Sequence, residues 1–337
     1  MNFEALITAL PVWGQWSVAA VAMVLGMWLL TKSADIFVEG AVALATRLHM
    51  PALLVGFVIV GFGTSAPEML VSSLAAAQGM TPLSLGNAYG SNITNILLIL
   101  GCSMLVAPIV LHRVALRRDI PFLLGLITLL FLLGLYGFSR LDGILLVAAF
   151  LLFLFWQVGI MLFQRGTIES DDPEEQEANL NKSIWIVLLQ TFGGLALLLL
   201  SSQILVTAAQ FMAEGAAAAA GISPEATQLI VGATVVALGT ALPELFTAVT
   251  AARKGNADIA IGNIVGSNIF NILFVVGLSS MVINVPFAAN FRIDMLVAIA
   301  SCVFIWLAAL KSKKLARWAG FTMLLGYVGY FIYLLMV

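Results

Sequence analysis

Two short stretches decide the fold of this chain: Gly63-Thr-Ser-Ala-Pro-Glu68 and Gly239-Thr-Ala-Leu-Pro-Glu244. The offset that places Gly63 on Gly239 also gives 19 identities over the 46 ungapped positions of 56–101 and 232–277. Chance does not supply that agreement. The chain therefore contains an internal repeat, and each copy carries one glutamate in an apolar setting.

Composition places this repeat in a lipid bilayer. Of the 337 residues, 62% are hydrophobic and 9% are charged, whereas soluble domains carry about 25% charged residues. Several apolar runs approach the roughly 20 residues that a helix needs to cross the hydrocarbon. The pattern predicts an all-α membrane protein with ten transmembrane helices, near 17–46, 51–77, 83–106, 119–137, 142–163, 183–212, 225–252, 257–283, 292–310 and 317–336.

The positive charges predict how these helices are oriented. Twelve Lys and Arg residues fall in connections on one side, and only Arg140 and Arg292 fall on the other. Because Lys and Arg accumulate in cytoplasmic loops, the richer side is predicted to be cytoplasmic and both termini to lie outside. An acidic linker over 166–182 would then lie in the cytoplasm, as a solvated connection.

The linker divides the chain into two groups of five helices, 1–165 and 183–337, with the repeated motifs near 51–106 and 225–283. An odd number of spans per copy makes the second copy enter the membrane from the opposite side, so the repeats are predicted to be inverted. Inverted repeats occur in many secondary transporters, with the substrate near the bilayer midplane. Channels also carry repeats, so the pattern favours a carrier without excluding a channel. It predicts no enzyme, cofactor or nucleic-acid partner, and leaves the oligomeric state open.

The two motif glutamates predict a cation site. A carboxylate at the centre of a membrane helix costs at least about 2.5 kcal/mol, so Glu68 and Glu244 need a cation, a partner or a proton. No Lys or Arg lies nearby in either span. Two acids brought together would repel each other, and a divalent cation between them would relieve that repulsion.

Neutral oxygens around the glutamates suit a hard cation such as Ca²⁺, which takes six to eight oxygen ligands. Thr64 and Thr240 each precede their glutamate by four residues, a spacing that predicts a shared helix face. Pro67 and Pro243 donate no backbone hydrogen bond, so they free the carbonyls of Gly63 and Gly239.

A second motif follows each glutamate. Ser91 and Asn95, like Ser267 and Asn271, are four residues apart and are predicted to offer hydroxyl and amide oxygens. The pairs Gly86/Gly90 and Gly262/Gly266 are predicted to serve close helix packing. For Asn87 and Asn263, contact between helices and contact with the ion both remain open.

Three charged residues interrupt the first span. Lys32, Asp35 and Glu39 are spaced to pair along one helix, which predicts a structural ion pair at a water-filled mouth. Only Glu39 has a counterpart in the second half, Glu214.

On these paired motifs the sequence resembles the sodium/calcium exchanger family of calcium/cation antiporters, in its prokaryotic form, over nearly the whole chain. The resemblance implies ten helices, four clustered cation sites in a cytoplasmic membrane, and sodium entry coupled to calcium extrusion. It also implies that the long helices over 17–46 and 183–212 slide across the other eight. Carried over by position, it assigns calcium to Glu68, Glu244, Thr64 and Thr240, assigns sodium additionally to Ser65, Ser91, Ser267 and the carbonyls of Gly61 and Ala237, and places Asn95 and Asn271 at polar central positions.

The chain departs from the family pattern at two positions. Ala241 stands where the motif usually has Ser, so one sodium-liganding hydroxyl is missing. Asn271 stands where some members have the Asp that the potassium-dependent branch needs, which argues against potassium coupling.

These observations predict Na⁺/Ca²⁺ exchange by alternating access, with a net charge moved in each cycle. Calcium/proton exchange is the alternative, because membrane carboxylates can also bind protons. A cation channel fits less well, because filters are usually rings around an oligomeric pore.

Overall fold

The computed structural model describes residues 12–163, 177, 179–221, 237–284 and 291–336. Most of the linker predicted over 166–182, and the first part of the span predicted over 225–252, lie outside the described residues. The described part is nearly all helical. Its one sheet is a short antiparallel pair, β1 (Ile109–Val110) with β2 (Lys314–Leu315).

The helices of the first half fall where the hydropathy pattern predicts helical spans. In chain order they are α2 (Val12–Leu48), α3 (Ala52–Val55), η1 (Gly56–Gly61), α4 (Phe62–Thr64), α5 (Ala66–Ala77), α6 (Thr81–Thr94), η2 (Asn95–Ile99), α7 (Leu100–Val106), η3 (Ala115–Asp119), α8 (Ile120–Gly134) and α9 (Arg140–Phe163).

The helices of the second half follow the same order. They are α11 (Ile184–Leu188), η4 (Leu189–Gly193), α12 (Gly194–Ala219), α14 (Ala237–Thr240), α15 (Leu242–Arg253), α16 (Ala257–Phe270), η6 (Asn271–Val275), α17 (Val276–Val282), α18 (Phe291–Leu310) and α19 (Arg317–Met336). Among the described residues, six helices are long and apolar enough to cross a membrane, and the bent pair formed by Ala52–Thr64 and Ala66–Ala77 makes a seventh. The prediction of an all-α membrane protein is confirmed.

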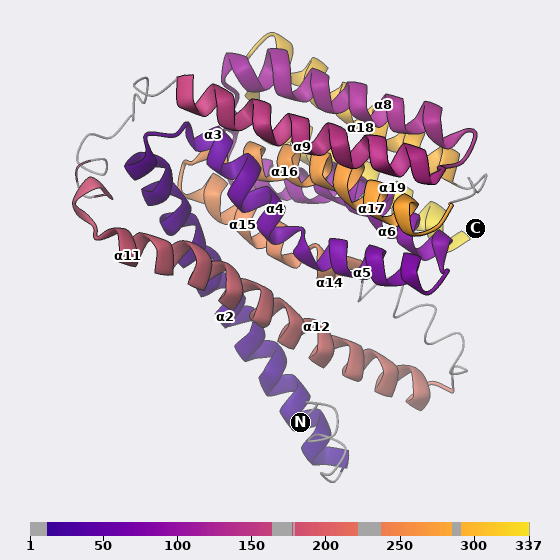
Figure 1. The fold of residues 1–337 in the computed structure, drawn as a ribbon. Coiled ribbons are helices and arrows are strands. Elements are labelled where there is room, and N and C mark those ends of the chain that lie inside the picture. The colour runs from indigo at the N-terminus through magenta and orange to yellow at the C-terminus, as the bar shows by residue number, and fades with distance from the viewer. Residues whose placement is uncertain (1–11, 164–176, 178, 222–236, 285–290, 337) are drawn as a thin grey trace.

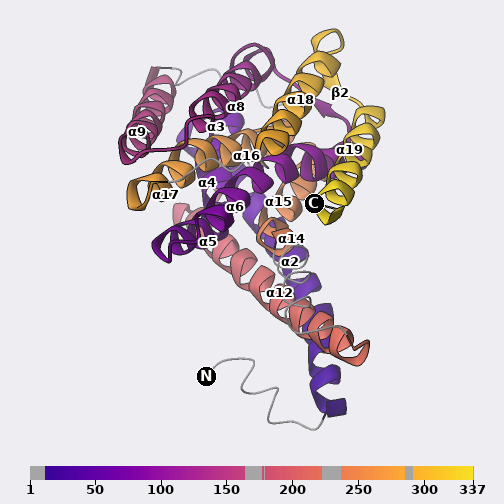
Figure 2. The same ribbon diagram turned by 90° about the vertical axis from the view of Figure 1, so that its right-hand side faces the viewer.

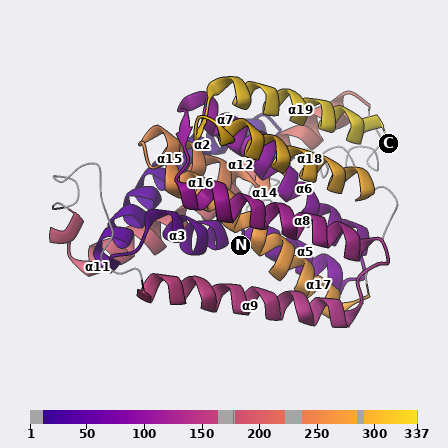
Figure 3. The same ribbon diagram turned by 90° about the horizontal axis from the view of Figure 1, so that it is seen from above.

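The motif-bearing helices form the centre of the bundle. In the span Ala257–Val282, 94% of the most apolar window is buried, and in Leu83–Val106 61% is buried. The corresponding share is only 28–33% in the other four single-helix spans. Seen from above, α16 runs through the middle of the bundle, with α8 and α9 to one side of it (Figure 3). The repeated sequences therefore lie where they can enclose a site, and the remaining helices keep more of their apolar residues on the outside of the bundle.

The two copies of the repeat have the same local structure. Helix α5 matches α15, α6 matches α16, η2 matches η6 and α7 matches α17, and the bounds of each pair differ by the offset that relates Gly63 to Gly239. Gly79 and Gly255 both have positive φ, +77° and +80°, at the turn that follows the glutamate helix. A π-helical turn recurs in each copy from Asn95 and from Asn271, and such turns are frequent at functional sites.

Helices α2 and α12 form a pair whose inner parts share the core of the bundle. Their ends project away from the other helices in two perpendicular views (Figures 1 and 2). A Cβ atom on Gly40 of α2 would lie 2.5 Å from the backbone nitrogen of Thr191 in η4, which leads into α12, and one on Gly194 of α12 would lie 2.9 Å from the Cα of Phe37. Since neither glycine leaves room for a side chain, the two helices touch through their backbones.

The predicted close packing holds for the second Gly-x-x-x-Gly pair. A Cβ atom on Gly262 would lie 2.5 Å from the Leu53 carbonyl oxygen, and one on Gly266 would lie 2.3 Å from the Phe57 carbonyl oxygen. Helix α16 therefore lies directly against α3 and η1. For Gly86 and Gly90 the packing stays a prediction, because the residues that match Leu53 and Phe57 in the second copy, 229 and 233, lie outside the described residues.

Candidate cation site

Each motif glutamate lies in the first turn of a half-helix. Helix α4 ends at Thr64, the chain bends by 46°, and α5 begins at Ala66 with Pro67 in its first turn. Proline is favoured there because the first amides of a helix lack an intrahelical partner. Glu68 and Glu244 are both 1% exposed, and each lies at the positive end of its helix dipole, which stabilises a carboxylate.

The hydroxyls of each motif reach the glutamate of the other repeat. Ser65 Oγ donates to Glu244 Oε1 at 2.9 Å. The Thr64 hydroxyl donates to Asn263 Oδ1 of the second repeat at 3.1 Å. Thr64 also interacts with Glu244, and Thr240 interacts with Glu68, so both contacts cross between the repeats. The two carboxyls are themselves close enough to interact electrostatically. One site is therefore assembled from both halves of the chain.

This arrangement corrects one prediction. The four-residue spacing of Thr64 and Glu68 predicts that the hydroxyl and the carboxyl share one helix face, as it does for Thr240 and Glu244. The bend at Ser65, where φ is −81° and ψ is 9°, interrupts that face, and Ala241 adopts nearly the same angles. Each threonine consequently serves the glutamate of the opposite repeat.

Both glutamates keep one free oxygen in this arrangement. Within the described residues, Oε2 of Glu68 and Oε2 of Glu244 are buried and accept no hydrogen bond. A buried polar atom without a partner costs free energy, so these oxygens are suited to a cation. No group of three or more His, Cys, Asp or Glu side chains that could hold a metal occurs in the described parts of the chain.

One backbone carbonyl assigned to sodium lies beside hydroxyls of both repeats. The Gly61 carbonyl oxygen accepts hydrogen bonds from Ser267 Oγ at 3.0 Å and from Thr64 Oγ1 at 3.3 Å. The structure thus brings Gly61 and Ser267 together, as a shared sodium site would require. In the other repeat, Ala237 begins α14 and Ser91 is buried on α6.

A carbonyl freed by proline finds a partner that sequence reasoning missed. The Gly239 carbonyl oxygen, which Pro243 leaves without an intrahelical donor, accepts a hydrogen bond from Ser202 Oγ at 3.1 Å. Ser202 lies on α12, 37 residues away in sequence. Helix α12 is therefore bonded directly to the segment that precedes Glu244, a contact that no local spacing indicates.

The asparagines next to the motifs hold the helices together. Asn87 Nδ2 donates to the Glu68 carbonyl oxygen at 3.1 Å, and Asn263 Nδ2 donates to the Glu244 carbonyl oxygen at 3.2 Å. These bonds are the same in the two copies and involve backbone rather than carboxyl oxygens. Of the two roles left open for Asn87 and Asn263, the structure supports contact between helices.

The two central asparagines differ from each other. Asn95 Nδ2 donates to Asn268 Oδ1 at 3.0 Å. The equivalent bond in the other copy, from Asn271 to Asn92, is not formed, and both amide atoms of Asn271 are buried without a partner among the described residues. The site is therefore unequal in its two halves even where the sequence repeats.

A family model described as "Sodium/calcium exchanger protein" matches residues 18–159 and 193–336. The chain belongs to the sodium/calcium exchanger family.

Individual relatives cover almost all of this family member. The "Putative antiporter CaxA" of Alkalimonas amylolytica is 38% identical over 328 residues, which cover 93% of this chain and 97% of that protein. The "Inner membrane protein YrbG" of Escherichia coli is 34% identical over 295 residues, or 86% and 89% of the two chains. The solved structure of the sodium-calcium exchanger NCX_Mj soaked with zero Na⁺ and Ca²⁺ superimposes with a TM-score of 0.79 at 28% identity, covering 94% of this chain and 98% of that one.

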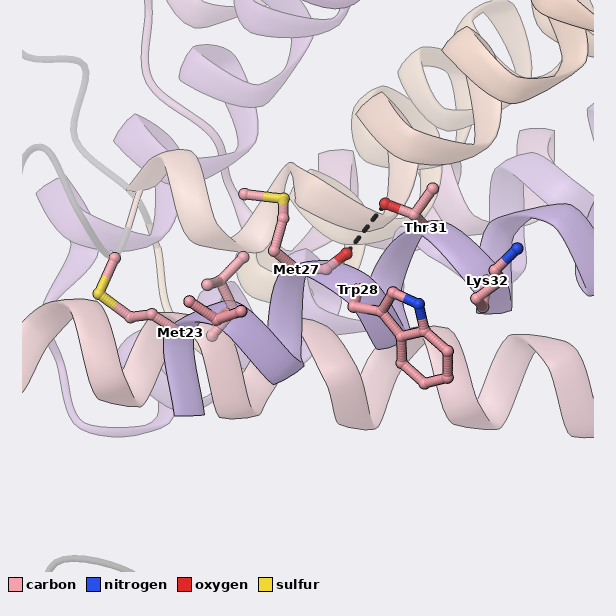
Figure 4. Close-up of a pocket in the computed structure, with 7 residues that line it drawn as sticks. Met23, Met27, Trp28, Thr31 and Lys32 are labelled. Atoms are coloured by element: carbon pink, nitrogen blue, oxygen red, sulfur yellow. Dashed lines mark hydrogen bonds between the residues drawn. The ribbon is translucent and has the colours of Figure 1, made fainter. Parts of the chain in front are cut away.

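This exchanger family member also has a surface groove, which is unrelated to the carboxyls. A groove of about 470 Å³ lies where α2 passes α12, and Thr31 Oγ1 donates to the Met27 carbonyl oxygen at 2.9 Å on its wall (Figure 4). Its lining is apolar apart from Thr31 and Lys32. Neither glutamate contributes to it, so the groove is not the cation site.

The ion pair predicted within the first span is wrong in its partners. Asp35 and Glu39 do not pair with Lys32; they pair with Arg253 and Lys254, at the end of α15. These partners are 218 and 215 residues apart in sequence, so no helical spacing rule can indicate the contacts.

Proposed function

We propose that this chain is an antiporter that exchanges Na⁺ for Ca²⁺ across a prokaryotic cytoplasmic membrane by alternating access. In this proposal ten transmembrane helices form two inverted repeats of five, with both termini outside. The observation that carries it is the pair of buried carboxyls, Glu68 and Glu244, each at the start of a half-helix and each served by hydroxyls of the opposite repeat.

The ligands follow from the chemistry of the site. Ca²⁺ would bind between the two glutamates, with the hydroxyls of Thr64 and Thr240 completing its oxygen shell. Na⁺ would use the same carboxyls together with Ser65, Ser91, Ser267 and the carbonyls of Gly61 and Ala237. Asn95 and Asn271 would lie at the centre of the cluster as neutral oxygen donors. The chain needs no resident cofactor for this cycle, because the ions are its substrates.

The two ions would compete for the same two carboxyl groups, so only one kind of ion would occupy them at a time. The two carboxylates together carry −2, which one Ca²⁺ neutralises. Three Na⁺, the number that the family resemblance implies, would leave the site at +1. Each cycle would therefore be an exchange that moves net charge across the membrane.

The exchange is tested with everted membrane vesicles loaded with sodium and diluted into sodium-free medium. We expect uptake of labelled calcium, and we expect Glu68→Gln and Glu244→Gln to abolish it, because each replaces an anionic ligand by a neutral amide of nearly the same shape. Glu214→Gln, at a glutamate outside the site, is the matched control and should leave uptake intact.

Two outcomes would replace the proposal. Uptake that follows a pH gradient and ignores sodium would make the protein a calcium/proton antiporter. Calcium flux that persists without any counter-ion would make it a channel.

A further inference from the structure

A cluster of ion pairs joins α2 to the far end of α15. Arg253 Nη2 contacts Asp35 Oδ1 at 2.5 Å, Lys254 Nζ contacts Glu39 Oε1 at 2.5 Å, and Lys254 Nζ lies 3.8 Å from Asp35 Oδ1. The site chemistry uses none of these four side chains. We define them together as the α2–α15 clasp.

The clasp connects the α2–α12 pair to the other helices. Helix α2 is packed backbone to backbone with α12, and the outer ends of this pair project from the bundle (Figures 1 and 2). Helix α15 belongs to the bundle and carries Glu244 in its first turn. In carriers built from repeats, alternating access is largely the movement of one bundle against another around a fixed site. The clasp therefore spans the boundary at which such a movement must occur.

The clasp lies on one face of the membrane only. Arg253 follows Glu244 by nine residues, which is about 14 Å along a helix and close to half of the roughly 30 Å hydrocarbon thickness. If Glu244 lies near the midplane, Arg253 reaches the bilayer surface on the side that carries most of the Lys and Arg residues.

The repeat provides no matching clasp on the other face. The positions equivalent to Arg253 and Lys254 are Ala77 and Gln78, which are uncharged. The counterpart of Glu39 is Glu214, whose Oε1 accepts a hydrogen bond from Gln210 Nε2 at 3.0 Å. Two inverted repeats of equal sequence would give the two facing states equal free energies, so a contact present on one face only must favour one of them.

We propose that the α2–α15 clasp holds the access path on the Arg253 face closed and so biases the carrier toward the state that opens to the opposite face. The inference rests on the proposed alternating-access function. Breaking the clasp populates the state that is open on the Arg253 face. The population shift is about three- to tenfold, because exposed ion pairs are individually weak and several of them act together here.

Partial exposure makes the clasp sensitive to salt. The side chains of Arg253 and Glu39 are 52% and 50% exposed, and those of Asp35 and Lys254 are 23% and 25% exposed. The distance over which exposed charges act on one another shrinks from about 10 Å at 0.1 M salt to about 3 Å at 1 M salt. High salt on the Arg253 face therefore reproduces part of the effect of removing the clasp.

Affinity measured separately at each face tests the proposal. When a ligand binds only one state, its apparent dissociation constant equals the intrinsic dissociation constant divided by the fraction of protein in that state. A larger population of the open state therefore lowers the apparent dissociation constant. In a variant that neutralises the whole clasp, with Asp35→Asn, Glu39→Gln, Arg253→Gln and Lys254→Gln, the half-saturating Ca²⁺ concentration at the Arg253 face should fall about three- to tenfold, while the value at the opposite face stays or rises. The charge-swapped pair, Asp35→Arg with Arg253→Asp, should restore the original values, and Glu214→Gln is the control on the other face.

A second measurement does not depend on transport. Spin labels on Ile36 of α2 and Val110 of β1, both exposed, report the distance between α2 and β1 in liposomes without Ca²⁺. The neutralised variant should shift the distance distribution, and 1 M KCl should shift the unmodified protein in the same direction. If exchange is absent but the distances shift, the proposed exchange is refuted while the effect of the clasp on conformation is supported. If the neutralised variant keeps both the distances and the half-saturating Ca²⁺ concentrations of the unmodified protein, the role of the clasp is refuted.

Discussion

Restoring the missing hydroxyl at position 241 is the sharpest test of the asymmetric site. Ala241 is 4% exposed and has φ −83° and ψ −2°, close to the −81° and 9° of its counterpart Ser65. Serine can therefore adopt the backbone conformation that is already present. By the symmetry of the repeats, the new hydroxyl in Ala241→Ser would face Glu68, whose Oε2 has no partner among the described residues.

The magnitude follows from the contact that the other repeat already makes. Ser65 Oγ lies 2.9 Å from Glu244 Oε1 in a fully buried setting. A hydrogen bond to a charged group contributes about 1.5–3 kcal/mol, and every 1.4 kcal/mol is about tenfold in an equilibrium constant. The half-saturating sodium concentration of Ala241→Ser should therefore fall about tenfold, and in Ser65→Ala it should rise by a similar factor.

The assay is sodium-driven uptake of labelled calcium into vesicles, titrated with sodium at a fixed calcium concentration. Ala252→Ser adds the same hydroxyl to a buried position near the end of α15 and should leave the sodium titration unchanged. A half-saturating sodium concentration within twofold of the original in a well-folded Ala241→Ser protein would refute the reasoning. So would an equal change in Ala252→Ser.

Three further substitutions test contacts around the site. Asn263→Ala removes the bond to the Glu244 carbonyl and should lower thermal stability in detergent by about 1–3 kcal/mol, because it leaves a buried acceptor unpaired. Gly266→Ala places a Cβ atom 2.3 Å from the Phe57 carbonyl oxygen, so folded yield on size-exclusion chromatography should drop sharply, whereas Gly125→Ala, with open space around it, should not change it. Asn271→Leu removes a buried amide without partners among the described residues. It should raise the melting temperature and weaken ion-dependent uptake. A lower melting temperature together with weaker uptake would contradict a ligand role for Asn271.

Much of the fold could be predicted because the repeat fixes it twice. Apolar runs mark the helices, and the shared offset marks which residues are equivalent, so the sequence alone singles out Glu68 and Glu244. The residues that share a helix face across the motif could not be predicted. Spacing rules assume a continuous helix, and the 46° bend between Thr64 and Ala66 turns each threonine toward the other repeat.

Contacts between distant parts of the chain lay beyond sequence reasoning for a different reason. The partners of Asp35 and Glu39 come from the other half of the chain, and the bond from Ser202 to the Gly239 carbonyl crosses between separate helices. Charge spacing within α2 favours a local pair with Lys32, because spacing rules apply only to residues of the same helix. The close packing of Gly40 against Thr191 depends on the same kind of long-range contact.

The inequality of the two half-sites bears directly on coupling. Glu244 has two hydroxyls from the opposite repeat, Thr64 and Ser65, whereas Glu68 has Thr240 and faces Ala241 on the side where a second would lie. A cation bound beside Glu68 would therefore have one fewer hydroxyl oxygen to share than a cation bound beside Glu244. Inverted repeats face opposite sides of the membrane. A difference in the number of hydroxyls between the two repeats therefore makes ion access from the two sides of the membrane unequal as well.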